Sequence, residues 1–152
     1  MVEADTARFT VGVFQDTAWA QKGLDALKAA GFPVESMSIV MKDGPEAAAF
    51  IERTLGAAPE RVELAGIGAA VTRGPLVGVL QGPSRELPRL GLSGTMRRVG
   101  FQPHDCRIFD ALTGRGGVLL AVQTEPRAAD CLAILFSYGG GNAAIGAWTG
   151  RV

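Results

Sequence analysis

The chain has 152 residues, of which 47% are hydrophobic and 20% are charged, and its 15 lysines and arginines balance 15 aspartates and glutamates. This length and composition are typical of one folded domain with a sizeable apolar core. A formal net charge of zero gives no electrostatic reason to expect a nucleic acid or an anionic membrane as partner. No uninterrupted apolar run reaches the roughly 18 residues of a membrane span.

Residues 9–42 predict a strand, a helix and a second strand. Phe9–Phe14 (FTVGVF) is an apolar, β-rich run. Asp16 is a good N-cap for the helix that follows, and Gly31 is a good C-terminal stop. Residues 36–42 alternate apolar and polar side chains, as a strand does. The apolar stripe of the helix is formed by Ala20, Leu24 and Leu27.

Residues 117–149 predict the same plan a second time. Val118–Gln123 (VLLAVQ) is the expected strand, Thr124 the N-cap, residues 139–141 the glycine stop and residues 143–148 the last strand. The expected helical stripe is Ala128, Leu132, Leu135 and Phe136. A constant offset places Leu24 on Leu132 and Leu27 on Leu135, which favours an internal repeat. The alternative is a chance similarity between two short amphipathic units.

Residues 43–116 separate the two units and carry signals of their own. Most of this insert is expected to be helical, with one strand at a sheet edge. The expected helices span residues 45–55, 75–80, 86–99 and 103–112, and the expected strand spans residues 66–73.

The sequence therefore predicts an α+β fold of ferredoxin-like type, in which two βαβ units form one antiparallel sheet. The chain is expected to be a single domain over residues 1–152, with βαβ units at 9–42 and 117–149 and the insert at 43–116. Both unit helices should cover one face of the sheet. Because VLLAVQ is apolar on both faces, the second face also needs cover. We expect the insert to provide most of it and a modest homodimer contact to complete it.

Three stretches resemble a family of small bacterial proteins, the general stress or heat-induced stress protein type. They are residues 11–40 (VGVFQDTAWAQKGLDALKAAGFPVESMSIV), 66–80 (GIGAAVTRGPLVGVL) and 91–125 (GLSGTMRRVGFQPHDCRIFDALTGRGGVLLAVQTE). The family has no established catalytic activity, so the resemblance implies no active site. Family members often carry a glycine- and alanine-rich apolar hairpin after the first unit. Here residues 45–64 are short and charged instead, so the membrane association of such hairpins is not expected.

Residues capable of catalysis or metal binding are scarce. The only histidine, His104, stands beside Asp105 at a helix start and is expected to be exposed. The segment around Ser93 fails the GxSxG pattern of serine hydrolases because Thr95 stands where glycine is required. Glycine-rich residues 66–74 and 114–117 match no phosphate-binding loop and indicate turns.

Cys106 and Cys131 fit no CxxC pattern and are expected to be reduced, buried thiols. Residues 1–8 are polar and acidic, unlike a secretory leader. We therefore expect a cytoplasmic protein without metal ion or cofactor.

Arg97, Arg98 and Arg107 are the candidate binding residues, as an anion patch together with helix N-termini. The alternative is a solvated helix face.

Three function classes follow. We expect a non-catalytic, stress-associated or protein-interaction module that forms a homodimer through sheet edges or helix faces. The alternatives are a regulatory domain that binds a small ligand, by analogy with other ferredoxin-like sheets, and an enzyme.

Overall fold

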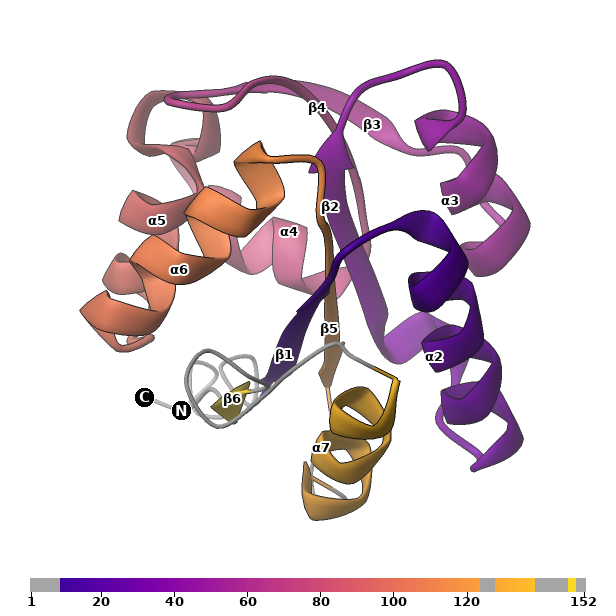
Figure 1. Cartoon of the computed structure of the whole chain (residues 1–152). Coiled ribbons are helices and arrows are strands. Elements are labelled where there is room, and N and C mark those ends of the chain that lie inside the picture. Colours follow the sequence, from indigo (N-terminus) through magenta and orange to yellow (C-terminus); the bar gives the residue numbers. More distant parts are fainter. Residues whose placement is uncertain (1–8, 124–127, 139–147, 150–152) are drawn as a thin grey trace.

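The computed structural model describes residues 9–123, 128–138 and 148–149. These residues form an α+β fold with a sheet of strand order β3-β4-β2-β5-β1-β6, in which every neighbouring pair is antiparallel (Figure 1). The strands are β1 (Phe9–Phe14), β2 (Met37–Lys42), β3 (Glu60–Leu64), β4 (Gly68–Arg73), β5 (Val118–Gln123) and β6 (Trp148–Thr149). The helices are α2 (Thr17–Ala29), the short 3₁₀ helix η1 (Val34–Ser36), α3 (Ala47–Leu55), α4 (Pro75–Gln81), α5 (Leu87–Arg98), α6 (Pro103–Gly114) and α7 (Ala128–Ser137).

The ends of α2 confirm the capping residues expected from the sequence. The Asp16 carboxylate accepts a hydrogen bond of 2.9 Å from the Trp19 backbone N–H at the first turn. Gly31 follows the last turn with a φ of 96°, a left-handed conformation that glycine adopts without the steric cost of a Cβ atom. The chain then enters β2 through η1. The expected N-cap Thr124 and the glycine stop at residues 139–141 lie outside the described residues.

One face of the sheet is covered by α2, α3 and α7, as the right-hand side of Figure 1 shows for α2 and α3. Leu24, Leu27 and Leu135 are fully buried on this face, as expected from the helical stripes. They pack against Phe14, Ile39, Leu120 and Val122 from the strands. The side chain of Leu132, the fourth expected core leucine, lies outside the described part of the chain.

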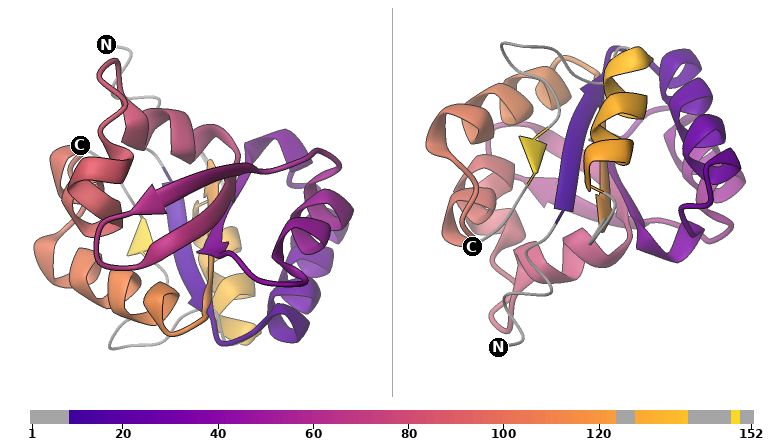
Figure 2. Two further views of the ribbon diagram at one scale, coloured as in Figure 1. Left: turned by 90° about the horizontal axis from the view of Figure 1, so that it is seen from above. Right: turned by 90° about the horizontal axis from the view of Figure 1, so that it is seen from below.

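The other face is covered by α4, α5 and α6, which all belong to the insert (Figure 2). Val11, Val13 and Leu119 point to this side of the sheet and are buried against the apolar side chains of these helices. Leu76, Leu80, Leu87, Leu92, Met96 and Phe109 supply most of the cover. The prediction that the insert shields the second face is confirmed. Residues 118–122 of β5 are buried on both faces of the sheet, as the apolar sequence of this strand requires.

The insert differs from the mostly helical prediction in forming a hairpin of two strands that extends the sheet. The expected strand at residues 66–73 is present as β4, but residues 60–64 were not predicted as a strand and form β3. Three of the five β3 residues are exposed because this strand lies at the edge of the sheet. The alternation of Val62 and Leu64 with charged residues is only five residues long, and just one of these side chains is fully buried, so the strand signal is weak. No helix among the described residues is long and apolar enough to cross a bilayer.

Candidate binding groove

The start of α4 is held tightly against the start of β2. Gly74 joins β4 to α4 with a φ of 117°, and a Cβ atom there would overlap the Met37 carbonyl oxygen and the Ser38 backbone. The buried Ser38 hydroxyl accepts a hydrogen bond of 2.9 Å from the Leu76 N–H in the first turn of α4. Glycine at residue 74 therefore permits a close approach of backbone to backbone, which fixes the position of α4 on the sheet.

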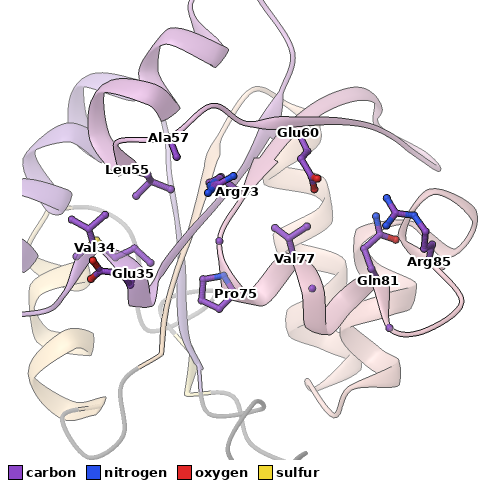
Figure 3. Close-up of a pocket in the computed structure, with 14 residues that line it drawn as sticks. Val34, Glu35, Leu55, Ala57, Glu60, Arg73, Pro75, Val77, Gln81 and Arg85 are labelled. Atoms are coloured by element: carbon purple, nitrogen blue, oxygen red, sulfur yellow. The ribbon is translucent and has the colours of Figure 1, made fainter.

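An open groove of about 630 Å³ lies beside this junction, between α4 and the segment that leads from α3 to β3 (Figure 3). Ligand sites in proteins commonly have volumes of about 300–1,000 Å³. Its apolar lining includes Val34, Met37, Leu55, Pro75 and Val77, and its polar side chains are Glu35, Glu60, Arg73, Gln81 and Arg85. The groove therefore combines an apolar lining with a few polar groups, as small-molecule sites do.

Arg73 and Arg85 supply the cationic groups of the groove. Arg73 ends β4, and its Nη1 donates a hydrogen bond of 3.3 Å to the Ala58 carbonyl oxygen, which orients the guanidinium. Arg85 follows α4 and has a φ of 49°, the one left-handed conformation of a residue other than glycine in the described ranges. Such a conformation costs on the order of 1–3 kcal/mol and is concentrated at functional sites. Both side chains are exposed and lie beside the groove in Figure 3.

Glu35 and Glu60 place two carboxylates along the same groove. Glu35 lies at the end formed by η1, and Glu60 projects from the first residue of β3 toward the side that carries Gln81 and Arg85 (Figure 3). Both side chains are exposed. Two guanidinium groups and two carboxylates thus line one concave surface, so the groove has polarity of both signs without a large excess of either.

A second open depression of about 530 Å³ continues along β3. It shares Glu60, Gln81 and Arg85 with the first groove and extends to Pro88 at the start of α5. The Pro88 carbonyl oxygen accepts a hydrogen bond of 3.3 Å from the Ala65 N–H, which ties the end of β3 to α5. Strand β3 is therefore bordered by hollow surface on the α4–α5 side.

The arginines predicted from the sequence lie elsewhere. Arg97 and Arg98 occupy the last turn of α5, and Arg107 lies on the neighbouring α6. The Arg98 guanidinium donates hydrogen bonds to the Leu80 and Val79 carbonyl oxygens at 2.6 and 3.4 Å and pairs with Glu86 at 3.2 Å. Arg98 thus closes the C-terminal end of α4. Arg97 and Arg107 are exposed, and the anion patch remains a prediction for these two residues.

The other residues considered for chemistry have structural surroundings. His104 is exposed at the start of α6, as expected. The Ser93 N–H donates a hydrogen bond of 3.0 Å to Asp110 on α6, at the point where Gly91 kinks α5. Burial raises the pKa of Asp105, and the neighbouring His104 lowers it. The described residues contain no group of three or more His, Cys, Asp or Glu side chains that could hold a metal ion.

Cys106 is a free, buried thiol, as expected, and Cys131 is buried as well. They lie on opposite sides of the sheet, Cys131 in the core under α2, α3 and α7 and Cys106 in the core under the insert. Burial, with smaller contributions from the Asp105 and Asp110 carboxylates, raises the pKa of the Cys106 thiol to about 11, whereas Arg97 acts in the opposite direction. The Cys106 thiol is therefore protonated and a poor nucleophile at neutral pH.

The polar residues of the groove were not predicted from the sequence. Glu35, Glu60, Arg73 and Arg85 are spread over 51 positions of the chain and belong to no motif. The one local signal was the Gly74–Pro75 pair after a strand, which marks a close turn into a helix but names no ligand. Comparison of the chain with models of protein families, with curated proteins and with solved structures gives no match in any of the three.

Proposed function

We propose that the protein is a non-catalytic binding module, and that the groove beside α4 takes a small zwitterionic ligand of the size and chemistry of an amino acid. The observation that carries this proposal is the placement of two arginines and two glutamates around one concave surface with an apolar lining. Arginine binds carboxylates in a bidentate manner, and a carboxylate binds an ammonium group. A ligand that carries one carboxylate and one ammonium group can therefore bind an arginine and a glutamate of the groove at the same time.

Charge decides between this ligand class and a purely anionic one. A nucleotide or a polyphosphate at Arg73 would bring several negative charges near Glu35 and Glu60, whose carboxylates would repel them. A small zwitterion adds no net charge to the groove. The apolar wall formed by Leu55, Pro75 and Val77 further favours a ligand with a hydrophobic side chain.

The ferredoxin-like assignment is part of this proposal. Its support is that β5 of the second unit lies between β1 and β2 of the first, while β1 lies between β5 and β6. A regulatory role and a cytoplasmic location are consistent with such a module. Stress association and a bacterial source rest on the family resemblance alone.

Calorimetric titration of the full chain with free amino acids tests the ligand class. We expect the amino acids with apolar side chains to bind, and we expect their N-acetyl derivatives and their amides, which lack one of the two charges, to bind at least about tenfold more weakly. A ligand present at 100 times its dissociation constant adds about 2.7 kcal/mol of stability, so thermal unfolding provides a second measurement.

Two variants locate the site. Arg73→Gln removes one guanidinium and should weaken binding at least about tenfold. Arg85→Gly removes the other at a backbone conformation that glycine adopts without strain, so it should weaken binding with little loss of stability. Arg107→Gln on α6 is the matched control and should leave the affinity unchanged. Failure of every free amino acid to bind would reject the proposal, as would binding that depends on Arg107 and not on Arg73.

A further inference from the structure

Strand β3 leaves one edge of the sheet unpaired within the described residues. Its other edge is paired with β4, from Glu60 opposite Thr72 to Leu64 opposite Gly68. The left panel of Figure 2 looks onto β3, and no helix passes in front of it. Glu60, Arg61 and Glu63 are exposed and Val62 is half-buried. An open edge of this kind offers backbone N–H and C=O groups to another strand.

The antiparallel hydrogen-bond pattern limits how two copies of β3 can pair. Residues opposite each other in an antiparallel pair have the same hydrogen-bonding orientation, and this orientation alternates along a strand. The pairing with β4 already fixes which β3 residues point their backbone groups outward. When two identical strands are related by a two-fold axis, one residue must therefore lie opposite its own copy. The axis passes beside that residue and cannot fall between two neighbouring residues.

The charges of β3 select one of these registers. An axis beside Arg61 would place Arg61 opposite the partner's Arg61, and an axis beside Glu63 would place two glutamates opposite each other. Like charges directly opposite destabilise a sheet. An axis beside Val62 pairs all five residues, places Val62 opposite the partner's Val62, and places Arg61 opposite the partner's Glu63 twice, once on each side of the axis.

We propose that the protein forms a symmetric dimer in which β3 pairs with β3 of a second copy, centred on Val62, so that one antiparallel sheet runs through both subunits. This interface meets the proposed ligand groove at Glu60, the first residue of β3, whereas Arg73 and Arg85 of the groove lie outside the strand. The occupant of the edge is a second copy because the sequence ERVEL is complementary in charge to itself when it is reversed.

The surroundings of the charged residues fit this pairing. Arg61 and Glu63 alternate with Val62 and Leu64, and Leu64 belongs to the core under the insert, so the two charged side chains lie on the opposite face. The Arg61 side chain is 68% exposed, and its guanidinium pairs at 3.1 Å with Asp43, which lies on the β2 side of β4, so in the dimer Arg61 exchanges Asp43 for the partner's Glu63. Glu63 forms no ion pair among the described residues, so its carboxylate is available to the partner's Arg61.

The contact is small, because a single strand of five residues forms its centre. Stable protein interfaces commonly bury at least about 1,000 Å², so we expect a weak dimer with a dissociation constant between about 1 μM and 1 mM. Sedimentation velocity of the full chain up to about 1 mM measures this association. A monomeric mass throughout that range would overturn the proposal.

Charge reversal tests the register itself. Arg61→Glu places two glutamates opposite each other on both sides of the axis, and Glu63→Arg does the same with arginines, so each variant alone should dimerise at least about tenfold more weakly. The double variant R61E/E63R restores opposite charges and should dimerise like the unmodified chain. An equimolar mixture of the two single variants should form a heterodimer, because each then faces its complement.

Circular dichroism confirms that each variant keeps its fold, and Arg107→Glu on α6 serves as the charge-reversal control that should not change the association. Dimers unaffected by both single variants would overturn the proposal by placing the interface elsewhere. Single variants that remain monomeric when mixed would also overturn it, since the selected register requires them to associate.

Discussion

The hydroxyl of Ser38 in β2 accepts a hydrogen bond of 2.9 Å from the backbone N–H of Leu76 in the first turn of α4. Both residues are fully buried, so this N–H has no water to bond in place of the hydroxyl. Ser38→Ala should destabilise the protein by about 1–3 kcal/mol, because it leaves a buried donor unsatisfied. Urea unfolding measures the loss, and Ser84→Ala at an exposed position should change stability by less than about 0.5 kcal/mol.

Gly74 should be far less replaceable than Gly78, four residues further along the same segment. Alanine at residue 74 would be strained at a φ of 117° and would place its Cβ against the backbone of Met37 and Ser38. Gly74→Ala should therefore cost more than about 3 kcal/mol. Gly78 lies inside α4 with open space around a Cβ, so Gly78→Ala should stabilise the protein by about 0.5–1 kcal/mol. Equal effects of the two substitutions in thermal unfolding would contradict the tight junction.

Leu27 anchors α2 in the core and is fully buried. Leu27→Ala removes buried apolar surface and leaves a cavity, so it should cost about 2–5 kcal/mol in chemical denaturation. Asp25→Ala on the exposed side of the same helix is the control, with an expected change within about 0.5 kcal/mol. A loss below that value at Leu27 would mean that α2 presents a different face to the sheet.

Cys106 should make stability depend on pH in the alkaline range. Its pKa of about 11 lies above the ordinary thiol value of 9.0, so the unfolded chain loses this proton at a lower pH than the folded protein. The contribution is fully present below pH 9 and is lost as the pH rises toward 11, because ionisation of the thiol then favours the unfolded state. The difference in unfolding free energy between the unmodified chain and Cys106→Ala should shrink across this interval. A difference in unfolding free energy that stays constant from pH 9 to 11 would contradict the raised pKa of Cys106.

Local sequence signals were sufficient for the elements that pack into the core. The spacing of Leu24 and Leu27 gave the buried face of α2, and Asp16 and Gly31 gave its ends. The apolar residues on both faces of Val118–Gln123 predicted that helices would cover the sheet on both sides. Such signals are visible in the sequence alone, because buried positions recur with the period of the helix or strand that contains them.

Only the tertiary structure decided what lies at the edge of the sheet and in the groove. Strand β3 exists because β4 pairs with it, and its charged side chains give no local sign of burial. One groove is lined by the distant residues Glu35, Glu60, Arg73 and Arg85, because α4 packs across the start of β2. Arg98, which the sequence suggested for an anion patch, instead binds the end of α4. Side chains distant along the chain converge through packing between elements, and no local periodicity encodes that packing.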